Sequence, residues 1–274
     1  MHVGKKNNIE EATTDSDSIL GDANINALVV STRHNSHASW VRKGLEAGKH
    51  VFVEKPLALT RLELESLNDF YSGLSSPPLL MVGFNRRYSP LVQLLKRALV
   101  NKQQPKSIIY TINAGAIPAD HWTQDPEVGG GRIIGEACHF IDLIKYLVGS
   151  TITNVSVQAL DCAQKDTVSI HLTFADGSIG TVHYFANGNK SFPKERVEVF
   201  CGGAIGIVDN YRWLRASGIA GLKNQRLWKQ DKGQRQCAKA FVDAVEAGDS
   251  RDLIPYGELV EVASACFDVV DQLA

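Results

Sequence analysis

Strand-like and helix-like segments alternate in the first part of the chain, and this alternation constrains the fold more than any other feature of the sequence. Short apolar runs of β type lie at residues 26–31, 51–53 and 79–84, and segments of helical pattern separate them. Thr60 followed by Glu63 is typical of a capping box at a helix start. Strand–helix–strand order with right-handed connections produces a parallel sheet covered by helices. The first part of the chain is therefore expected to be half of a doubly wound domain.

After residue 105 the pattern becomes that of an antiparallel sheet. A strand at residues 107–113 and a strongly apolar helix at residues 132–148 are followed by consecutive β-like runs. Asp176 and Gly177 join two of these runs and form a hairpin signal. The runs lie at residues 151–158, 167–174, 179–185, 196–201 and 205–208.

Helices at residues 234–247 and 256–272 close the chain. The sequence predicts an α/β fold, with a truncated parallel sheet at residues 1–88 and an α+β domain with a large antiparallel sheet at residues 89–274. The last helices are placed to pack back on the first domain.

Composition excludes several classes of protein. The net charge is −1 and the pI is about 6.7, so no basic excess indicates nucleic acid. Five cysteines are widely spaced and odd in number, which argues against a disulfide framework and for a reducing compartment. His34 and His37 form an H-x-x-H, but no second pair has zinc-ligand spacing, and no metal is expected. Without an apolar run of membrane length, the sequence predicts a soluble, cytoplasmic protein.

The stretch HVFVEKPLALT at residues 50–60 ends a buried strand on two charged residues and a proline. Pro56 cannot donate to a sheet ladder, and it biases Lys55 toward extended backbone. The amine should therefore project from the carboxyl end of a parallel strand, where ligands bind in such sheets. The alternative is an ordinary solvated strand terminus, and this stretch alone does not decide between the two.

The apolar helix at residues 132–148 contains Glu136, His139 and Asp142, spaced by three and so expected on one face. Buried ionisable groups are costly unless they are paired or functional. Three glycines at residues 129–131 allow backbone to approach a ligand at the helix start. The alternative is a core histidine satisfied by its own helix neighbours.

Taken together, these motifs resemble the glucose–fructose oxidoreductase / inositol dehydrogenase (Gfo/Idh/MocA) family. The resemblance runs from about residue 8 to the end, and its motifs occur in the family's order. They are ALVVST at residues 27–32, AGKHV at 47–51, EKPLA at 54–58, GFNRRYSP at 83–90, and the triple glycine with His139 and Asp142.

The resemblance implies hydride transfer between NAD or NADP and a carbon of a sugar, nucleotide sugar or cyclic polyol, with a small carbohydrate as the partner molecule. His139 is then the base for the hydroxyl proton, Lys55 stabilises the same oxygen, and Glu136 assists. The implied cofactor contacts are Thr32, His34, Asn35, His37, Glu54, Lys55 and Pro56. The implied substrate contacts are Arg86, Arg87, Trp122 and Asp142, although a solvated arginine pair and a packed indole are equally good explanations of three of them.

Departures from the family pattern leave a second interpretation open. Gly135 stands where many members have aspartate, and Arg33 replaces a usual proline. The sequence contains no Gly-x-Gly-x-x-Gly loop, so we expect the first strand–helix–strand unit to be missing, in a truncated gene or in a piece cut from a longer fusion. The alternative function is a non-catalytic remnant, a sugar-binding or assembly module with weak dinucleotide binding.

The run TVSIHLTF at residues 167–174 has an apolar face and a weakly polar face. Val168, Ile170, Leu172 and Phe174 alternate with Ser169, His171 and Thr173, and few charges occur on the second face. A free sheet face is usually charged, so this one suits burial against a second copy. We expect a homodimer or higher homo-oligomer through the antiparallel sheet. The alternative is an exposed face that happens to be neutral.

Overall fold

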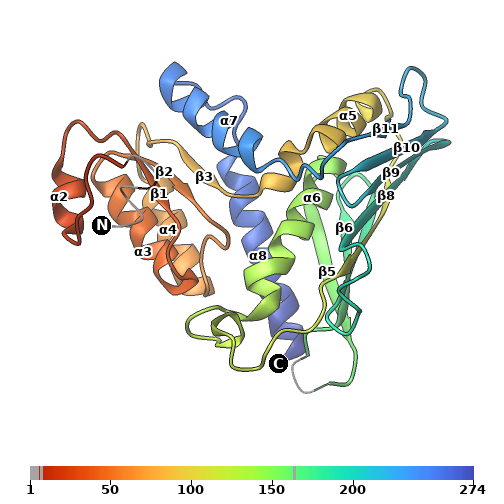
Figure 1. Ribbon diagram of the computed structural model, residues 1–274, viewed down its shortest axis with the longest axis horizontal. Helices are drawn as coiled ribbons and strands as arrows, with labels where there is room; N and C mark the ends of the chain where they lie inside the picture. Colours follow the sequence, from red (N-terminus) through yellow and green to blue (C-terminus); the bar gives the residue numbers. More distant parts are fainter. Residues whose placement is uncertain (1–5, 7–8, 163–164) are drawn as a thin grey trace.

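A computed structural model describes residues 6, 9–162 and 165–274 of the chain. Its first sheet is parallel, with strand order β1-β2-β3 and helices in the connections (Figure 1). Val51 and Val53 of β2 are fully buried, as expected of the middle strand of a parallel sheet. The elements are α2 (Ser16–Gly21), β1 (Ala27–Val30), α3 (His37–Glu46), β2 (His50–Val53), α4 (Arg61–Ser72) and β3 (Leu80–Val82).

The second sheet has eight strands in the order β11-β10-β9-β8-β4-β7-β6-β5. All neighbouring strands are antiparallel except β4 and β7, which run parallel with Tyr110 beside Val182. Its strands are β4 (Ser107–Asn113), β5 (Ile152–Ala159), β6 (Val168–Phe174), β7 (Ile179–Phe185), β8 (Glu195–Cys201), β9 (Ala204–Asp209), β10 (Trp213–Ser217) and β11 (Gln225–Arg226).

The α/β fold class predicted from the sequence is confirmed, and two features of the large sheet were not predicted. The parallel contact of β4 with β7 is possible because a helix and a hairpin separate the two strands along the chain. Strand β10 escaped prediction because WLRAS lacks a clear alternation, and its pairing with β9 holds it in the sheet.

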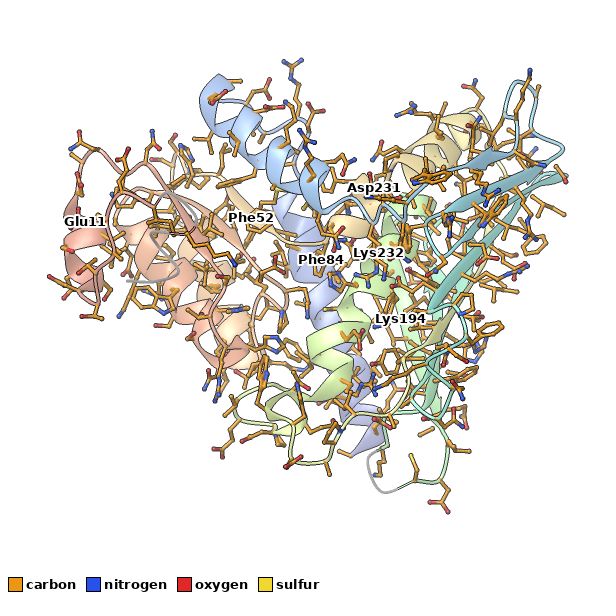
Figure 2. All side chains as sticks on the ribbon, in the orientation of Figure 1. Glu11, Phe52, Phe84, Lys194, Asp231 and Lys232 are labelled. Carbon is orange, nitrogen blue, oxygen red and sulfur yellow. The ribbon has the colours of Figure 1, made fainter. Side chains whose placement is uncertain are left out.

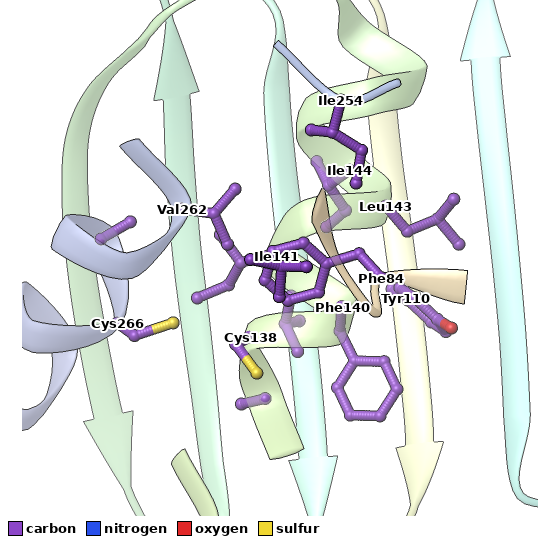
Figure 3. Packing of buried hydrophobic residues seen from close by; sticks show 14 of the residues in the cluster. Phe84, Tyr110, Cys138, Phe140, Ile141, Leu143, Ile144, Ile254, Val262 and Cys266 are labelled. Carbon is purple, nitrogen blue, oxygen red and sulfur yellow. The ribbon is translucent and has the colours of Figure 1, made fainter. Parts of the chain in front are cut away.

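Four helices complete the fold: α5 (Pro90–Leu99), α6 (Cys138–Val148), α7 (Gln234–Ala247) and α8 (Tyr256–Leu273). Helix α6 lies between α8 and the large sheet, and its buried side chains fill the space between them (Figure 3). Phe140 of α6 packs edge-on against Tyr110 of β4, with ring centroids 5.0 Å apart. On the other side of α6, Val262 and Cys266 of α8 belong to the same buried cluster.

Helix α7 packs on the first sheet in a second, smaller cluster. Phe241 of α7 contacts Phe52 of β2 with ring centroids 5.7 Å apart, and Met81 of β3 is fully buried beside them. The two sheets are thus joined by the C-terminal helices as well as by the chain that runs from β3 to α5. Among the residues that the structure describes, no helix is both long and apolar enough to cross a membrane.

Most local predictions agree with the structure. The side chain of Thr60 accepts from the backbone of Glu63, and Glu63 caps the Thr60 backbone in return. The helix predicted at residues 132–148 differs, because it opens with a π-helical turn at Ile133–Ala137 before α6 begins. Such turns often occur at functional sites. Ser89 lies directly before α5, which begins at Pro90, and its hydroxyl donates to the Asp231 carbonyl and makes no cap hydrogen bond with the helix.

A buried ionic cluster ties the segment after β3 to the large sheet. Arg86 donates to both carboxylate oxygens of Glu195, at 2.7 and 2.9 Å, and Lys232 and the Tyr110 hydroxyl also donate to Glu195. The Glu195 side chain has no exposed surface. Burial by itself raises the pKa of Glu195, but Arg86 and Lys232 outweigh it and lower the pKa from 4.5 to about 2.

Glu195→Gln is expected to lower the free energy of unfolding at pH 7 by about 3 kcal/mol, because Arg86 and Lys232 keep their buried charges without a carboxylate. A depressed pKa stabilises the fold above the pKa of the unfolded chain, and this stability is lost as the pH falls toward the folded pKa. The difference in the free energy of unfolding between the parent protein and Glu195→Gln should therefore shrink by about 1 kcal/mol as the pH falls from 6 to 3.5. Urea unfolding at several pH values measures it, with exposed Glu246→Gln as the control. If this difference did not change with pH, the lowered pKa of Glu195 would be contradicted.

Candidate functional site

A cavity of about 360 Å³ lies between the carboxyl end of the parallel sheet, the start of α6, and the end of β4 with the beginning of β8 in the large sheet. The π-helical turn supplies Gly135 and Glu136, and α6 supplies His139. The cavity collects residues from parts of the chain that are more than a hundred positions apart. Its polar lining consists of His34, Lys55, Arg86, His121, Trp122, Thr123, Arg132, Glu136, His139 and Lys194.

A larger hollow of about 850 Å³ lies elsewhere, between α5 and α7. Most of its charged residues pair with one another, as in Lys239 with Asp243 and Arg251 with Asp249. In contrast, the smaller cavity contains the Lys55 amine, which has no carboxylate within 4 Å among the described residues, and the His139 imidazole, whose buried Nδ1 has no hydrogen-bond partner among them. We therefore regard the smaller cavity as the candidate active site.

Lys55 enters this cavity from the end of β2. Its ammonium group donates to the carbonyl of Gly135 at 2.7 Å, and within 4 Å of it there is no carboxylate from any residue that the structure describes. The Lys55–Pro56 peptide bond is cis. His37 holds this loop in place: its Nδ1 lies 2.7 Å from the Pro56 carbonyl and its Nε2 lies 3.1 Å from that of Thr32. The loops after β1 and β2 are thus joined through one buried imidazole.

His139 lies in the wall of the cavity with 6% of its surface exposed. Its Nδ1 is buried and has no hydrogen-bond partner among the described residues. Burial lowers the pKa of His139 well below 6.5, and Arg86, Lys55 and Lys194 lower it further. The imidazole is therefore neutral at pH 7 and can accept a proton.

Glu136 is the one carboxylate among the described residues that line the cavity. It contacts the Lys194 ammonium and the Tyr184 hydroxyl, and Arg132 Nη2 lies 3.4 Å away. Burial tends to raise the pKa of Glu136, but Lys194 and the hydrogen bond from Tyr184 outweigh it, and the pKa is lowered. Glu136 is thus ionised at neutral pH and acts as an acceptor of hydrogen bonds.

The triple glycine brings the loop around Trp122 against the start of the π-helical turn. A Cβ on Gly129 would lie 2.5 Å from the Trp122 carbonyl oxygen, and Gly131 adopts a φ of +72°. The Gly129 carbonyl lies 2.8 Å from Nδ1 of His34, whose ring packs edge-on against Trp122. Burial lowers the pKa of His34 to about 4, with further lowering by Lys55 and His37 against the effect of the Gly129 hydrogen bond.

The structure brings six of the residues predicted from the sequence to the cavity and leaves the others outside its lining. Thr32, Asn35 and Glu54 are exposed near the ends of β1 and β2, whereas His37 and Pro56 are buried. The six that line the cavity are Lys55, His139 and Glu136 from the catalytic set, His34 from the cofactor set, and Arg86 and Trp122 from the substrate set.

Arg87 and Asp142 do not line this cavity, in contrast to the role expected for them. They form a buried ion pair with each other, and Arg87 also donates to Glu258 at 2.9 Å. In an α-helix a spacing of three residues falls short of a full turn by about 60°, and the shortfall is larger in the π-helical turn that carries Glu136. Over two steps this shortfall turns Asp142 away from the face that carries Glu136.

Lys194, Arg132 and Tyr184 were not identified from the sequence. Arg132 had a usable signal, because it lies four residues before Glu136 at the start of a buried helix. Lys194 lies in the loop before β8 and Tyr184 in β7, and neither belongs to a recognisable motif. Figure 2 shows Lys194 and Lys232 near α6, where the large sheet approaches it.

Comparison with known proteins identifies both parts of the chain. Residues 2–74 match the oxidoreductase family with an NAD-binding Rossmann fold, and residues 105–204 match the GFO/IDH/MocA C-terminal domain. The chain is 27% identical over 208 residues to myo-inositol 2-dehydrogenase of Thermotoga maritima, covering 76% of this chain and 56% of that enzyme. It is 32% identical over 157 residues to scyllo-inositol 2-dehydrogenase (NAD⁺) of Bacillus subtilis, covering 56% and 44%. The chain thus spans about half the length of these curated relatives.

Solved structures show the same fold over nearly the whole chain. Levoglucosan dehydrogenase in complex with NADH and levoglucosan superposes with a TM-score of 0.81 at 23% identity, covering 99% of this chain and 84% of that one. UDP-N-acetylglucosamine 3-dehydrogenase from Acidithiobacillus ferrooxidans gives 0.79 at 19% identity, covering 99% and 85%. With both family domains matched in order and the fold shared, the chain belongs to the Gfo/Idh/MocA oxidoreductase family.

Proposed function

We propose that this protein is an NAD(P)-dependent oxidoreductase that transfers hydride to or from a carbon of a sugar, nucleotide sugar or cyclic polyol. The observation that carries the proposal is the convergence of Lys55 and His139 on one cavity at the carboxyl end of a parallel sheet. Ligands bind at this end of such sheets. The family match to an NAD-binding Rossmann fold supports the cofactor class.

The chain's own residues divide the work of oxidising an alcohol. His139 is neutral and takes the hydroxyl proton on a ring nitrogen as negative charge develops on the substrate oxygen. Lys55 donates a hydrogen bond to the same oxygen, in place of its contact with the Gly135 carbonyl. In the reverse direction His139 returns the proton. Glu136, held by Lys194 and Tyr184, accepts hydrogen bonds from further hydroxyl groups.

The residues around the cavity fit the nicotinamide end of a dinucleotide. His139 Nδ1 is buried with no partner among the described residues, and the Lys55 ammonium has no carboxylate partner there. When bound, NAD(P) supplies the ring carbon that accepts or gives up the hydride. We assign Thr32, His34, Asn35 and Glu54 to the surroundings of the nicotinamide and ribose, with His37 and Pro56 fixing the loops that carry them.

The substrates of similar proteins indicate the range of compounds to test. Inositols are the substrates named for two curated relatives, and levoglucosan and UDP-N-acetylglucosamine are named for two of the similar structures. All are ring alcohols. We propose that a ring alcohol of this kind is also the substrate here, with Arg86 and Trp122 in contact with it.

Titration of the full chain with NADH and NADPH, followed by the fluorescence of the reduced nicotinamide, tests the proposal directly. We expect saturable binding, followed by formation of NADH from NAD⁺ with at least one of myo-inositol, scyllo-inositol and levoglucosan. Lys55→Met should lower kcat/KM by about 100-fold or more, because the developing oxyanion loses its donor. Lys223→Met, an exposed lysine outside the cavity, is the matched control. Absence of dinucleotide binding would favour the alternative, a sugar-binding or assembly module without catalysis.

The pH profile tests the role of His139. Because the pKa of His139 is well below 6.5, its base form persists as the pH falls, and kcat/KM for alcohol oxidation should stay flat from pH 8 to pH 6. An imidazole with an ordinary pKa would lose about fourfold over this range. Initial rates of NADH formation at fixed ionic strength measure the profile. A fourfold fall that His139→Asn removes would overturn the assignment of a lowered pKa.

We further propose that the open face of the large sheet forms a dimer contact. The face that points away from α6 carries Ile109 of β4 and Phe200 of β8, which are 38% and 36% exposed, and His171 of β6. Ile109 lies beside Thr181 of β7. A partly apolar sheet face suits burial against a second copy, and the charges of Arg196 and Glu198 on this face pair with each other.

The double variant Ile109→Glu with His171→Glu is expected to give a monomer, because four carboxylates would be buried at a two-fold interface. Light scattering after size-exclusion chromatography measures the particle mass. Asn101→Glu with Gln103→Glu adds the same charge on an exposed turn outside the sheet and should leave the mass of the dimer unchanged. If the sheet variant keeps the mass of the parent protein, another surface mediates assembly or the protein is a monomer.

A further inference from the structure

The cavity carries an excess of positive charge. Four cationic side chains line it, Lys55, Arg86, Arg132 and Lys194, against the single carboxylate of Glu136. Uncharged ring alcohols need hydrogen-bonding groups but no net charge in their binding site. The net positive charge of this cavity therefore indicates the charge of the substrate, which the type of reaction alone does not indicate.

Ion pairs just outside the lining reduce this excess without removing it. Glu195 is shared between Arg86 and Lys232, which is a fifth cation, and Asp166 lies 3.6 Å from Arg132. Glu136 is shared between Lys194 and Arg132. In the part of the chain that the structure describes, the five cations thus have three carboxylates within 4 Å, and two positive charges remain.

Three of the cations have donors to spare. Among the described residues, the Lys55 ammonium makes one hydrogen bond, to a neutral carbonyl, and the Lys194 ammonium makes one, to Glu136. Arg86 uses Nε and Nη2 for Glu195, and its Nη1 donates to no described residue although Arg86 lines the cavity. Guanidinium and ammonium groups with free donors are the usual partners of carboxylates and phosphates in proteins.

The same excess weakens the base on which the reaction depends. After burial, the largest effects that lower the pKa of His139 come from Arg86, Lys55 and Lys194. A negative charge in the cavity would offset these cations and make His139 a stronger base when the substrate is bound. The arrangement is thus suited to a substrate that brings its own negative charge.

We propose that the substrate of this cavity is an anionic monosaccharide or cyclic polyol, with a carboxylate or a phosphate that contacts Lys194 and the free Nη1 of Arg86. The inference rests on the proposed function for the identity of the site and goes beyond it in the class of substrate. A volume of about 360 Å³ lies near the lower end of the range for small-molecule sites, roughly 300–1,000 Å³, and suits a single sugar ring.

Calorimetric titration of the full chain with matched ligands tests the charge preference. D-glucuronate and D-glucose 6-phosphate are compared with D-glucose, with and without saturating NAD⁺, at low and at physiological salt. At least one of the two anions should bind about tenfold tighter than glucose, and this advantage should shrink with added salt. The anion that binds tighter identifies carboxylate or phosphate as the group recognised. Equal or weaker binding of both anions would overturn the proposal.

Variants of the cavity separate a charge effect from damage to the fold. Lys194→Gln should weaken binding of the preferred anion about tenfold, and Lys194→Arg should restore most of it. Lys190→Gln, in the same loop but exposed and outside the lining, should change nothing. Glu136→Gln should tighten binding of the anion severalfold by removing the one negative charge of the lining, a gain that general destabilisation cannot produce. Loss of anion binding in Glu136→Gln with binding of glucose intact would contradict the proposal.

Failure of this inference can be told apart from failure of the proposed function. Binding of NADH and turnover of a neutral ring alcohol without any preference for the anions would retain the oxidoreductase and reject the anionic substrate. Mutually exclusive binding of NADH and the anions would assign the cations to the dinucleotide phosphates, and it would also reject the proposal. Tight anion binding in the absence of NADH binding would support the inference and reject the oxidoreductase.

Discussion

The buried contact of Arg86 with Glu195 is the interaction on which the arrangement of the molecule depends. It joins the segment that follows the parallel sheet to the first residue of β8 in the large sheet, and the carboxylate is fully shielded from water. Removing one partner from such a pair typically destabilises a protein by about 3–5 kcal/mol, because the other charge stays buried alone. The two charged groups are buried and are joined by two hydrogen bonds. The pair therefore fixes how the end of β3 faces the large sheet. Arg86 also lines the cavity, and the same contact therefore sets both the fold and one wall of the site.

The second constraint is the helix between the two sheets. Helix α6 is buried on nearly all sides, against α8 on one side and the large sheet on the other (Figures 1 and 3). Because α6 is surrounded by other elements, its polar side chains have few possible orientations. His139 of α6 and Glu136 of the preceding π-helical turn face the cavity, and Asp142 of α6 pairs with Arg87. The π-helical turn before α6, together with the glycines that precede it, allows the loop around Trp122 to close against the helix start.

The Arg86–Glu195 pair and the buried position of α6 bring more cationic than anionic side chains to the cavity. Cations reach the cavity from the end of β2, from the segment after β3, from the start of the π-helical turn and from the loop before β8. In this partly buried space, each of them affects the ionisation of its neighbours. Burial, and after it these cations, keep His139 neutral, and the cations keep Glu136 ionised against the effect of burial. The chemistry of the site is in this sense a property of the cluster and not of single residues.

Local structure could be predicted from the amino-acid sequence: the alternation of strands and helices, the capping box at Thr60, the glycines before the apolar helix, and the projection of Lys55 from a strand end. These features depend on the preferences of neighbouring residues, which a short window of sequence contains. Motif resemblance further pointed to His139 and Glu136, and the cavity contains both. The packing of the folded chain was needed to see that Asp142 pairs with Arg87, that Arg86 is held by a glutamate 109 positions away, and that Lys194 pairs with Glu136. Such contacts depend on how sheets and helices pack, and side chains so far apart along the chain leave no periodic signal in it.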